Sequence, residues 1–132
     1  MRQIVYSQRL GGRLTPVAPG VLDASLAGIA EAATVDAQLS FADERSFQLT
    51  GEIRLEGEGT LRFRSLGSGR LDPSPEPGLR HGTAVLEVCS GTGRFDGAHG
   101  RITSNFVVSD DGEITDHQLG VVFVAMQSKE EP

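Results

Sequence analysis

Apolar and polar residues alternate along much of this chain, and this alternation limits the fold more than any other sequence feature. Every second residue is apolar over 35–41, and the same spacing returns over 47–55, with Gly51 as an interruption, and over 61–64. A two-residue period places one face of a β-strand against a core and the other face in water. Residues 56–59 carry two glycines between two of these segments, which is typical of a hairpin turn. We therefore predict half-buried antiparallel strands.

Five further segments complete a set of eight strand candidates. Residues 3–10 are rich in β-formers, and Gly11-Gly12 predicts a turn that ends this strand. Residues 21–33 remain open between two interpretations. Asp23 and the spacing of the apolar residues favour a capped helix, whereas the neighbouring strands favour a strand, towards which we lean. The other candidates are residues 83–89, 101–108 and 114–125.

Residues 67–80 contain a proline at every second position from Pro73 to Pro77. Proline has no backbone N–H and cannot donate to a sheet, so this segment is predicted to be an extended surface loop. Two roles remain open for it: a lid over one end of the domain, or a plain connection between distant strands, which is the more common outcome.

Length and composition restrict the class of protein. A chain of 132 residues with 38% hydrophobic residues can form one ordinary core, so we expect a single domain over 1–126 and a solvated tail over 127–132. The net charge of −6 repels phosphate backbones, which argues against a nucleic-acid partner. No segment reaches the roughly 20 apolar residues of a membrane span, and the first residues lack a signal-peptide core. We expect a soluble, cytoplasmic protein with no membrane partner.

Cysteine and histidine chemistry is sparse. Cys89 is a single cysteine, which fits a reducing compartment, and we expect it to be a small buried residue rather than a nucleophile. The three histidines are far apart in the sequence and form no HxH or HExxH motif. We therefore expect no metal site.

The segment from Ser109 to Glu113 predicts the register of the last two strands. Two aspartates followed by Gly112 are typical of a three-residue hairpin with a left-handed glycine. If Ser109 pairs with Glu113, one face of the hairpin carries Ser104, Asp116 and Gln118 among apolar residues, and the other carries Asn105 and His117. The predicted pairs are Val108 with Ile114, Phe106 with Asp116, Ser104 with Gln118, Val107 with Thr115, Asn105 with His117, and Thr103 with Leu119.

A carboxylate on an apolar face is the most informative candidate group. Buried alone, Asp116 would have a raised pKa, whereas a neighbouring Arg62 or Arg64 would hold it ionised. The candidate catalytic residues are Asp116, His117 and Glu87, and the candidate ligand-binding residues are Ser104, Asn105, Gln118, Arg62 and Arg64. The alternatives are a satisfied internal hydrogen-bond network for the interior groups, a surface pair for His117 with Asn105, and a solvated strand face for the two arginines.

The stretch from Gly91 to Ile102 has the pattern G-x-G-x-F-x-G-A-x-G-x-I, in which Phe95 can anchor a glycine-rich corner in the core. This pattern, followed by a strand, a short turn and an apolar last strand, resembles the allene oxide cyclase and dirigent-like β-barrel superfamily (calycin-like). We expect a bacterial member. The resemblance implies an all-β fold, an eight-stranded antiparallel β-barrel, with a lumen that binds a hydrophobic small molecule, and assembly into dimers or trimers without cofactors.

Two functions follow from this resemblance and stay open. The first is a cofactor-free cyclase or isomerase, in which the barrel imposes the conformation of a hydrophobic substrate and one ionisable group moves a proton. The second is a non-catalytic binding or structural barrel whose interior polar groups only satisfy one another. A void of roughly 300 Å³ or more beside the proline-rich segment favours the first, and a filled interior favours the second.

Overall fold

The computed structural model describes residues 2–29 and 32–125, so the predicted tail over 127–132 lies outside the described residues. Within them the chain forms nine strands and one short 3₁₀ helix. The elements are β1 (Arg2–Ala18), β2 (Val21–Gly28), β3 (Ala33–Phe41), β4 (Ser46–Leu55), β5 (Gly59–Ser65), β6 (Gly69–Pro73), β7 (Leu79–Gly91), η1 (Gly93–Phe95), β8 (His99–Ser109) and β9 (Glu113–Val124).

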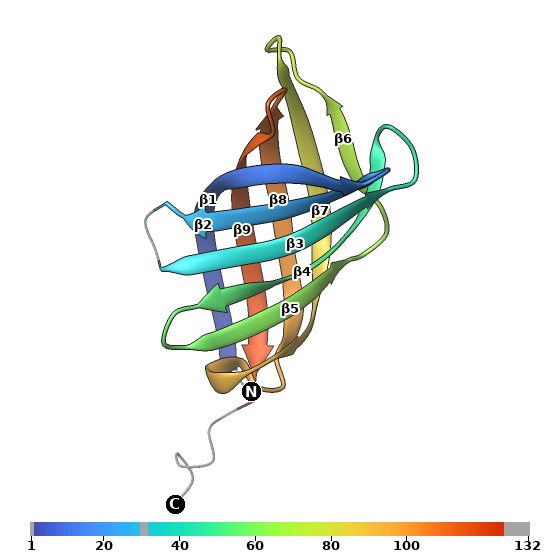
Figure 1. Ribbon diagram of the computed structural model, residues 1–132. Coiled ribbons are helices and arrows are strands. Elements are labelled where there is room, and N and C mark those ends of the chain that lie inside the picture. Colours follow the sequence, from blue (N-terminus) through green and yellow to red (C-terminus); the bar gives the residue numbers. More distant parts are fainter. Residues whose placement is uncertain (1, 30–31, 126–132) are drawn as a thin grey trace, which may run out of the picture.

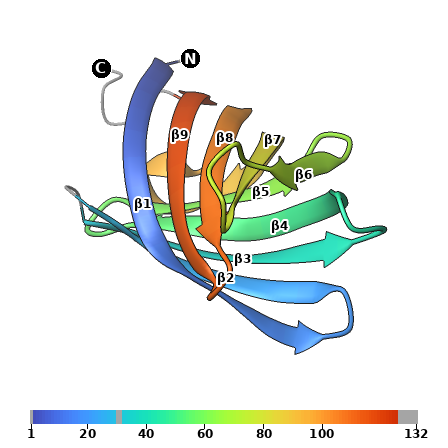
Figure 2. The same ribbon diagram turned by 90° about the horizontal axis from the view of Figure 1, so that it is seen from above.

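Eight of these strands close into an antiparallel barrel, which confirms the predicted fold class. The hydrogen-bonded order is β1, β2, β3, β4, β5, β7, β8 and β9, and β9 pairs back onto β1. Figure 1 shows the two groups of strands crossing around the interior, and Figure 2 shows their curvature from one end. The short strand β6 pairs with β4 and β7 beyond the end of β5 and widens the wall at one end of the barrel.

The barrel interior is filled mainly by aliphatic side chains. Alternate residues of each strand point inward, because successive side chains of a strand lie on opposite faces. Each of the nine strands contributes at least one buried apolar residue to a single continuous core. Examples from the strands in chain order are Leu10, Leu26, Val35, Ile53, Leu61, Leu71, Leu86, Ile102 and Val122.

The register of the last hairpin agrees with the prediction at every pair. Val108 lies opposite Ile114, Phe106 opposite Asp116, and Ser104 opposite Gln118. The three pairs on the outer face, from Val107 with Thr115 to Thr103 with Leu119, are also as predicted. Gly112 adopts a φ of 90°, in the left-handed region that glycine tolerates best. Local turn chemistry was therefore sufficient to set this register.

The predicted turn at Gly11-Gly12 is wrong, because β1 continues through both glycines to Ala18. Neither glycine has a positive φ. Gly12 instead permits a close approach of β2: a Cβ atom there would lie 1.9 Å from the Ser25 carbonyl oxygen. Gly12 thus allows β1 and β2 to pack closely in a curved wall and does not reverse the chain.

Three other local predictions are decided by tertiary contacts. Residues 21–28 form β2, so the strand interpretation of that part of 21–33 is confirmed. The loop predicted over 67–80 is partly wrong, since Gly69–Pro73 forms β6 and Leu71 is buried. Cys89 is exposed rather than buried. The β5–β7 register shifts between Ser90, opposite Arg62, and Val88, opposite Phe63, so Cys89 is the extra residue of a bulge.

Candidate functional site

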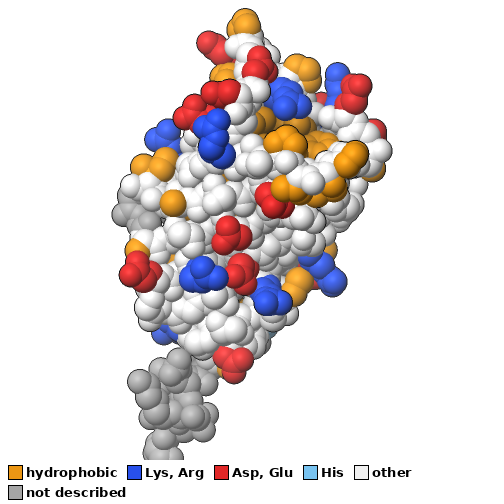
Figure 3. Space-filling view, viewed as in Figure 1, with side chains coloured by type: hydrophobic (Ala, Val, Ile, Leu, Met, Phe, Trp, Pro, Cys, Tyr) orange, Lys and Arg blue, Asp and Glu red, His pale blue; other side chains and the backbone are white. Residues whose placement is uncertain are grey.

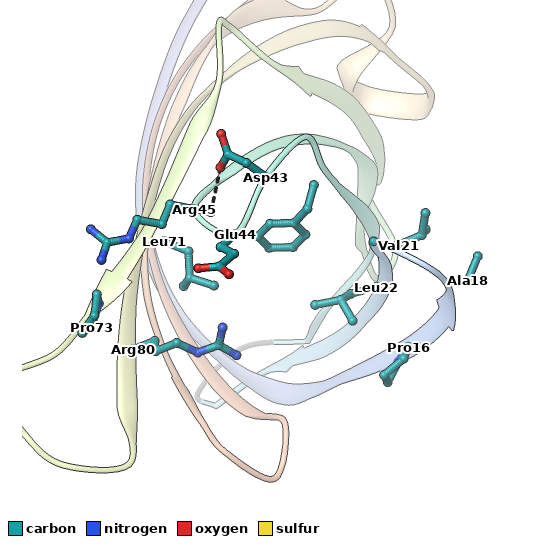
Figure 4. Close-up of a pocket in the computed structure, with 12 residues that line it drawn as sticks. Pro16, Ala18, Val21, Leu22, Asp43, Glu44, Arg45, Leu71, Pro73 and Arg80 are labelled. Carbon is teal, nitrogen blue, oxygen red and sulfur yellow. Dashed lines mark hydrogen bonds between the residues drawn. The ribbon is translucent and has the colours of Figure 1, made fainter.

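The barrel has a hollow at its wide end, which we call the mouth pocket. It has a volume of about 500 Å³ and lies between the β1–β2 hairpin, the β3–β4 turn, β6 and the start of β7. Apolar side chains gather in this hollow, and charged side chains surround it (Figure 3). In Figure 4, Leu22 and Leu71 line its inner part, and Glu44 and Arg80 extend across its opening. The volume lies in the range of small-molecule sites, roughly 300–1,000 Å³.

The rim of the mouth pocket is held by a capped turn. The Asp43 carboxylate accepts hydrogen bonds from the backbone N–H groups of Arg45 and Ser46, each at 2.8 Å. The Arg45 N–H bond, followed by that of Ser46, lowers the pKa of Asp43 below its usual value. The Arg45 guanidinium lies 3.4 Å from the Asp72 carboxylate of β6, and the Arg45 carbonyl accepts from the Leu71 N–H at 2.7 Å. The turn and β6 are therefore joined by a backbone hydrogen bond and an ion pair, both through Arg45.

Three phenylalanines connect the mouth pocket with the centre of the barrel. Phe41 lines the mouth pocket, and its ring centroid lies 5.4 Å from that of Phe47. The Phe47 ring lies 5.9 Å from the Phe106 ring, which lines a small central cavity. These tilted contacts are typical of stable aromatic pairs. Phe47 thus contacts one ring that lines the mouth pocket and one that lines the central cavity.

The central cavity has a volume of only about 20 Å³ and contains the predicted interior polar residues Ser104, Asp116 and Gln118. The Ser104 hydroxyl donates to Asp116 Oδ1 at 2.7 Å, and the Gln118 side-chain amide donates to Oδ2 at 2.9 Å. The side-chain amide of Gln8, on β1, donates to the side-chain carbonyl oxygen of Gln118 at 3.4 Å. The structure thus brings together the three residues that the hairpin register placed on one face, and it adds Gln8.

Burial dominates the electrostatics of Asp116. Only 6% of the residue is exposed, and desolvation raises the pKa of its carboxyl. The hydrogen bonds from Ser104 and Gln118 act in the opposite direction, as does His117, but they do not cancel the effect of burial. Asp116 therefore takes up a proton more readily than an exposed aspartate, which is a useful property for a group that transfers protons.

The other predicted site residues lie on the outer surface. Asn105 and His117 face each other across β8 and β9, and both are exposed. Arg64 donates to Glu87 at 3.1 and 3.2 Å on the outer face, so neither residue enters the lumen. Arg62 is also exposed and lies 3.7 Å from a carboxylate oxygen of Glu52. The structure therefore does not place an arginine beside Asp116: strand parity turns Arg62 and Arg64 outward, whereas Phe63 between them points inward.

Several site residues were missed by the sequence prediction. Arg80 reaches the mouth pocket from the end of the predicted loop over 67–80, and Glu44 reaches it from between two predicted strands. Tyr6 points into the barrel, as alternation along β1 requires, and its buried hydroxyl has no hydrogen-bond partner among the residues that the structure describes. Alternation divides residues 3–10 into two faces that can be read from the sequence. Which of these faces is interior depends on the pairing of β1 with β9.

The described residues contain no group of three or more histidine, cysteine, aspartate or glutamate side chains arranged to hold a metal ion. Over the same residues, no helix has the length and apolar character to cross a membrane.

Neither the protein-family models nor the curated proteins compared with this chain match it. Among solved structures, the chain is similar to the pterocarpan synthase dirigent protein GePTS1, with a TM-score of 0.62 and 13% sequence identity. The alignment covers 94% of this chain and 92% of that protein. A likeness at this identity concerns the fold and leaves the activity undecided. The chain has a dirigent-like antiparallel β-barrel fold.

Proposed function

We propose that this barrel binds an apolar small molecule through its mouth pocket. The observation that carries the proposal is the hollow of about 500 Å³, with an apolar lining inside a charged rim. An apolar ligand would gain free energy by displacing water from this lining, and the rim charges would orient a polar end of the ligand. The similar barrel of a protein described as a pterocarpan synthase dirigent protein supports a small-molecule role.

The catalytic form of this proposal is a cofactor-free cyclase or isomerase with Asp116 as the proton-transfer group. Burial raises the pKa of Asp116, so its carboxyl stays protonated to a higher pH than it would in water. A substrate seated in the mouth pocket would reach Asp116 after the Phe41 and Phe47 rings turn aside, and the barrel wall would hold the reacting conformation. The Asp116 carboxyl would give its proton to one substrate atom, and its carboxylate would take a proton from another, so the residue would regain its starting state without a cofactor.

A non-catalytic binding barrel is favoured by a different observation. The central cavity of about 20 Å³ holds little more than one water molecule, and both oxygens of Asp116 already accept hydrogen bonds. In this alternative the ligand stays in the mouth pocket, and Ser104, Asp116 and Gln118 only satisfy one another.

Binding is tested with N-phenyl-1-naphthylamine, an uncharged dye that fluoresces in apolar surroundings. Leu22→Asn removes apolar lining from the mouth pocket and should weaken dye binding about tenfold, while Leu119→Asn on the outer wall should leave it unchanged. Ala18→Glu, at the exposed rim, repeats the test without disturbing the core. If both mouth variants bind the dye as the unaltered protein does, the mouth pocket is not the site.

A pH titration of the ¹³C resonance of the Asp116 carboxyl distinguishes the catalytic form of the proposal from the binding form. In the catalytic form, saturation with the dye changes the titration of this carboxyl, because the ligand reaches the central cavity. In the binding form, the titration is the same with and without the dye. An unchanged titration would therefore reject the catalytic role of Asp116 and keep the mouth pocket as a binding site.

A further inference from the structure

The barrel contains a second cavity at the end opposite the mouth, which we call the Tyr6 cavity. It has a volume of about 130 Å³ and lies between the first half of β1, the β4–β5 hairpin, η1 and the end of β9. Figure 1 shows η1 at this end, away from β6. Its apolar walls include Ile4, Leu61, Phe95 and Val122. The proposed ligand site at the mouth uses none of these residues.

The Tyr6 hydroxyl is an unsatisfied donor beside this cavity. Among the described residues it has no hydrogen-bond partner, although the oxygen atom is buried. The ring lies against Gly120, where a Cβ atom would approach it to 2.2 Å, so its position depends on that glycine. A buried polar group without a partner is costly, and such groups are rare unless a water or ligand satisfies them. A molecule in the cavity that accepts a hydrogen bond would relieve this cost.

The protonation state of the Tyr6 hydroxyl determines whether a bound molecule must accept or donate a hydrogen bond. Burial, and then the nearby Asp116 charge, raise the pKa of the Tyr6 phenol far above its ordinary value. The hydroxyl therefore keeps its proton at neutral pH and donates. Gln8 also lines the cavity, and one of its two side-chain N–H groups donates to Gln118, while the Arg94 guanidinium pairs with Glu58. Tyr6 is the buried donor that has no partner among the described residues, so it favours a ligand that carries an acceptor.

An ion pair covers one side of the Tyr6 cavity. Glu58, in the β4–β5 turn, accepts from the Arg94 guanidinium of η1, and the Arg94 backbone N–H donates to the Glu58 carbonyl oxygen at 2.9 Å. The guanidinium also lies 5.9 Å from the centre of the Phe95 ring. Both side chains are partly exposed, so they stand between the cavity and solvent. Rotation of Arg94 would open a route without unfolding the barrel.

We propose that the Tyr6 cavity binds a single-ring apolar molecule that carries one hydrogen-bond acceptor, held by the Tyr6 hydroxyl and admitted past Arg94. The size follows from the volume, since a buried apolar cavity of about 150 Å³ accommodates benzene. The site is independent of the mouth pocket and stands if the proposed function fails.

The chain supplies its own reporter for this site. It contains one tyrosine and no tryptophan, so its intrinsic fluorescence comes from Tyr6. Tetrahydropyran is the probe, because it is a six-membered ring with one ether acceptor, and cyclohexane is the matched ring without an acceptor. Tetrahydropyran should change the tyrosine emission along a saturable curve. If the emission does not change, or if the amide resonances that shift belong to the mouth pocket, the proposal is overturned.

Tyr6→Phe tests the hydrogen bond itself. The variant keeps the ring and removes a buried unsatisfied group, so it should fold at least as stably as the unaltered protein. Binding of both probes is followed in each protein through the amide resonances of Leu61 and Val122. The preference for tetrahydropyran over cyclohexane should fall by about fivefold in Tyr6→Phe. An unchanged preference would show that Tyr6 does not bind the acceptor and would overturn the proposal.

Arg94→Ala tests the route of entry. Removing the guanidinium should increase the rates of binding and release of tetrahydropyran together, about tenfold each, with a smaller change in affinity. Arg54→Ala is the matched control, because Arg54 also pairs with a glutamate but does not line the cavity. Equal exchange rates in Arg94→Ala and Arg54→Ala would contradict entry past Arg94.

Discussion

At the scale of single residues, Asp116 shows how the barrel interior can hold a carboxyl group. Charging a group in an apolar interior costs free energy, and two donors from Ser104 and Gln118 offset part of that cost. Because burial still raises the pKa of Asp116, the folded barrel favours the protonated carboxyl more than the unfolded chain does. Its contribution to stability is complete below the ordinary pKa of 3.8 and is lost as the pH rises through the folded-state pKa.

Asp116→Asn should remove this pH dependence, because asparagine does not ionise. Below about pH 3.8 the free energy of unfolding of the variant should not exceed that of the unaltered protein. At higher pH the difference should move steadily in favour of the variant. Denaturant unfolding at a series of pH values measures this difference, and Asp23→Asn on the outer face of β2 is the exposed control. If the two proteins differ in free energy of unfolding by the same amount at every pH, the pKa of Asp116 is not raised in the folded state.

At the scale of elements, the corner between β7 and β8 depends on one aromatic anchor. Phe95 ends η1 and is 4% exposed, as the glycine-rich motif predicted. Its N–H donates to the Thr92 carbonyl oxygen at 3.0 Å, and its carbonyl accepts from the Ala98 N–H at 2.9 Å. The corner therefore combines a tight backbone turn with burial of a large side chain, and both lie at the wall of the Tyr6 cavity.

Phe95→Ala should lower the free energy of unfolding by roughly 3 kcal/mol or more, because truncating a buried phenylalanine removes packing and leaves a cavity. Denaturant unfolding of the full chain measures the loss. Phe123→Ala is the matched control, since Phe123 lies on the outer face of β9, partly exposed and stacked on His99. Similar losses in the two variants would show that Phe95 does not anchor the corner.

At the scale of the whole molecule, exposed apolar side chains lie on the outer faces of β1, β9 and β7, with Thr103 of β8 between those of β9 and β7. Val5 is 61% exposed, Leu119 51% and Val85 42%. The registers connect them, because Val5 lies opposite Val121, and Thr103 lies opposite both Leu119 and Val85. This strip of exposed apolar residues, which Thr103 interrupts on β8, is of a kind typical of interfaces, and a strand wall can pair with its own copy about a twofold axis. We propose a second copy of this chain as its partner.

Leu119→Lys should therefore reduce self-association, because a charge at the centre of the strip would have to be desolvated in the dimer. Sedimentation equilibrium should show that the variant dissociates at protein concentrations at least about tenfold higher than those at which the unaltered chain does. Leu66→Lys, in the turn between β5 and β6, is the control for an added charge at another exposed apolar residue. A chain that is monomeric without any substitution would contradict the proposed partner.

The candidate site was only partly predictable from the sequence, for reasons that differ between residues. The register of β8 and β9 follows from the residues of the turn between them. The placement of Ser104, Asp116 and Gln118 on one face was therefore predictable. Glu87, Arg62 and Arg64 lie on strands whose parity local sequence did not determine, and the structure turns them outward. The mouth pocket combines residues from four parts of the chain, which no local pattern brings together.

By itself, the sequence determined the strand character of most segments, the last hairpin and the buried anchor at Phe95, because alternation and turn chemistry act between near neighbours. Only the tertiary structure decided that β1 runs through Gly12, that β6 joins the wall, and that the Tyr6 hydroxyl lies beside a cavity with no partner within residues 2–29 and 32–125. These features depend on which strands meet across the barrel. Closure of a sheet is set by contacts between residues far apart in the chain, and local patterns carry little of that information.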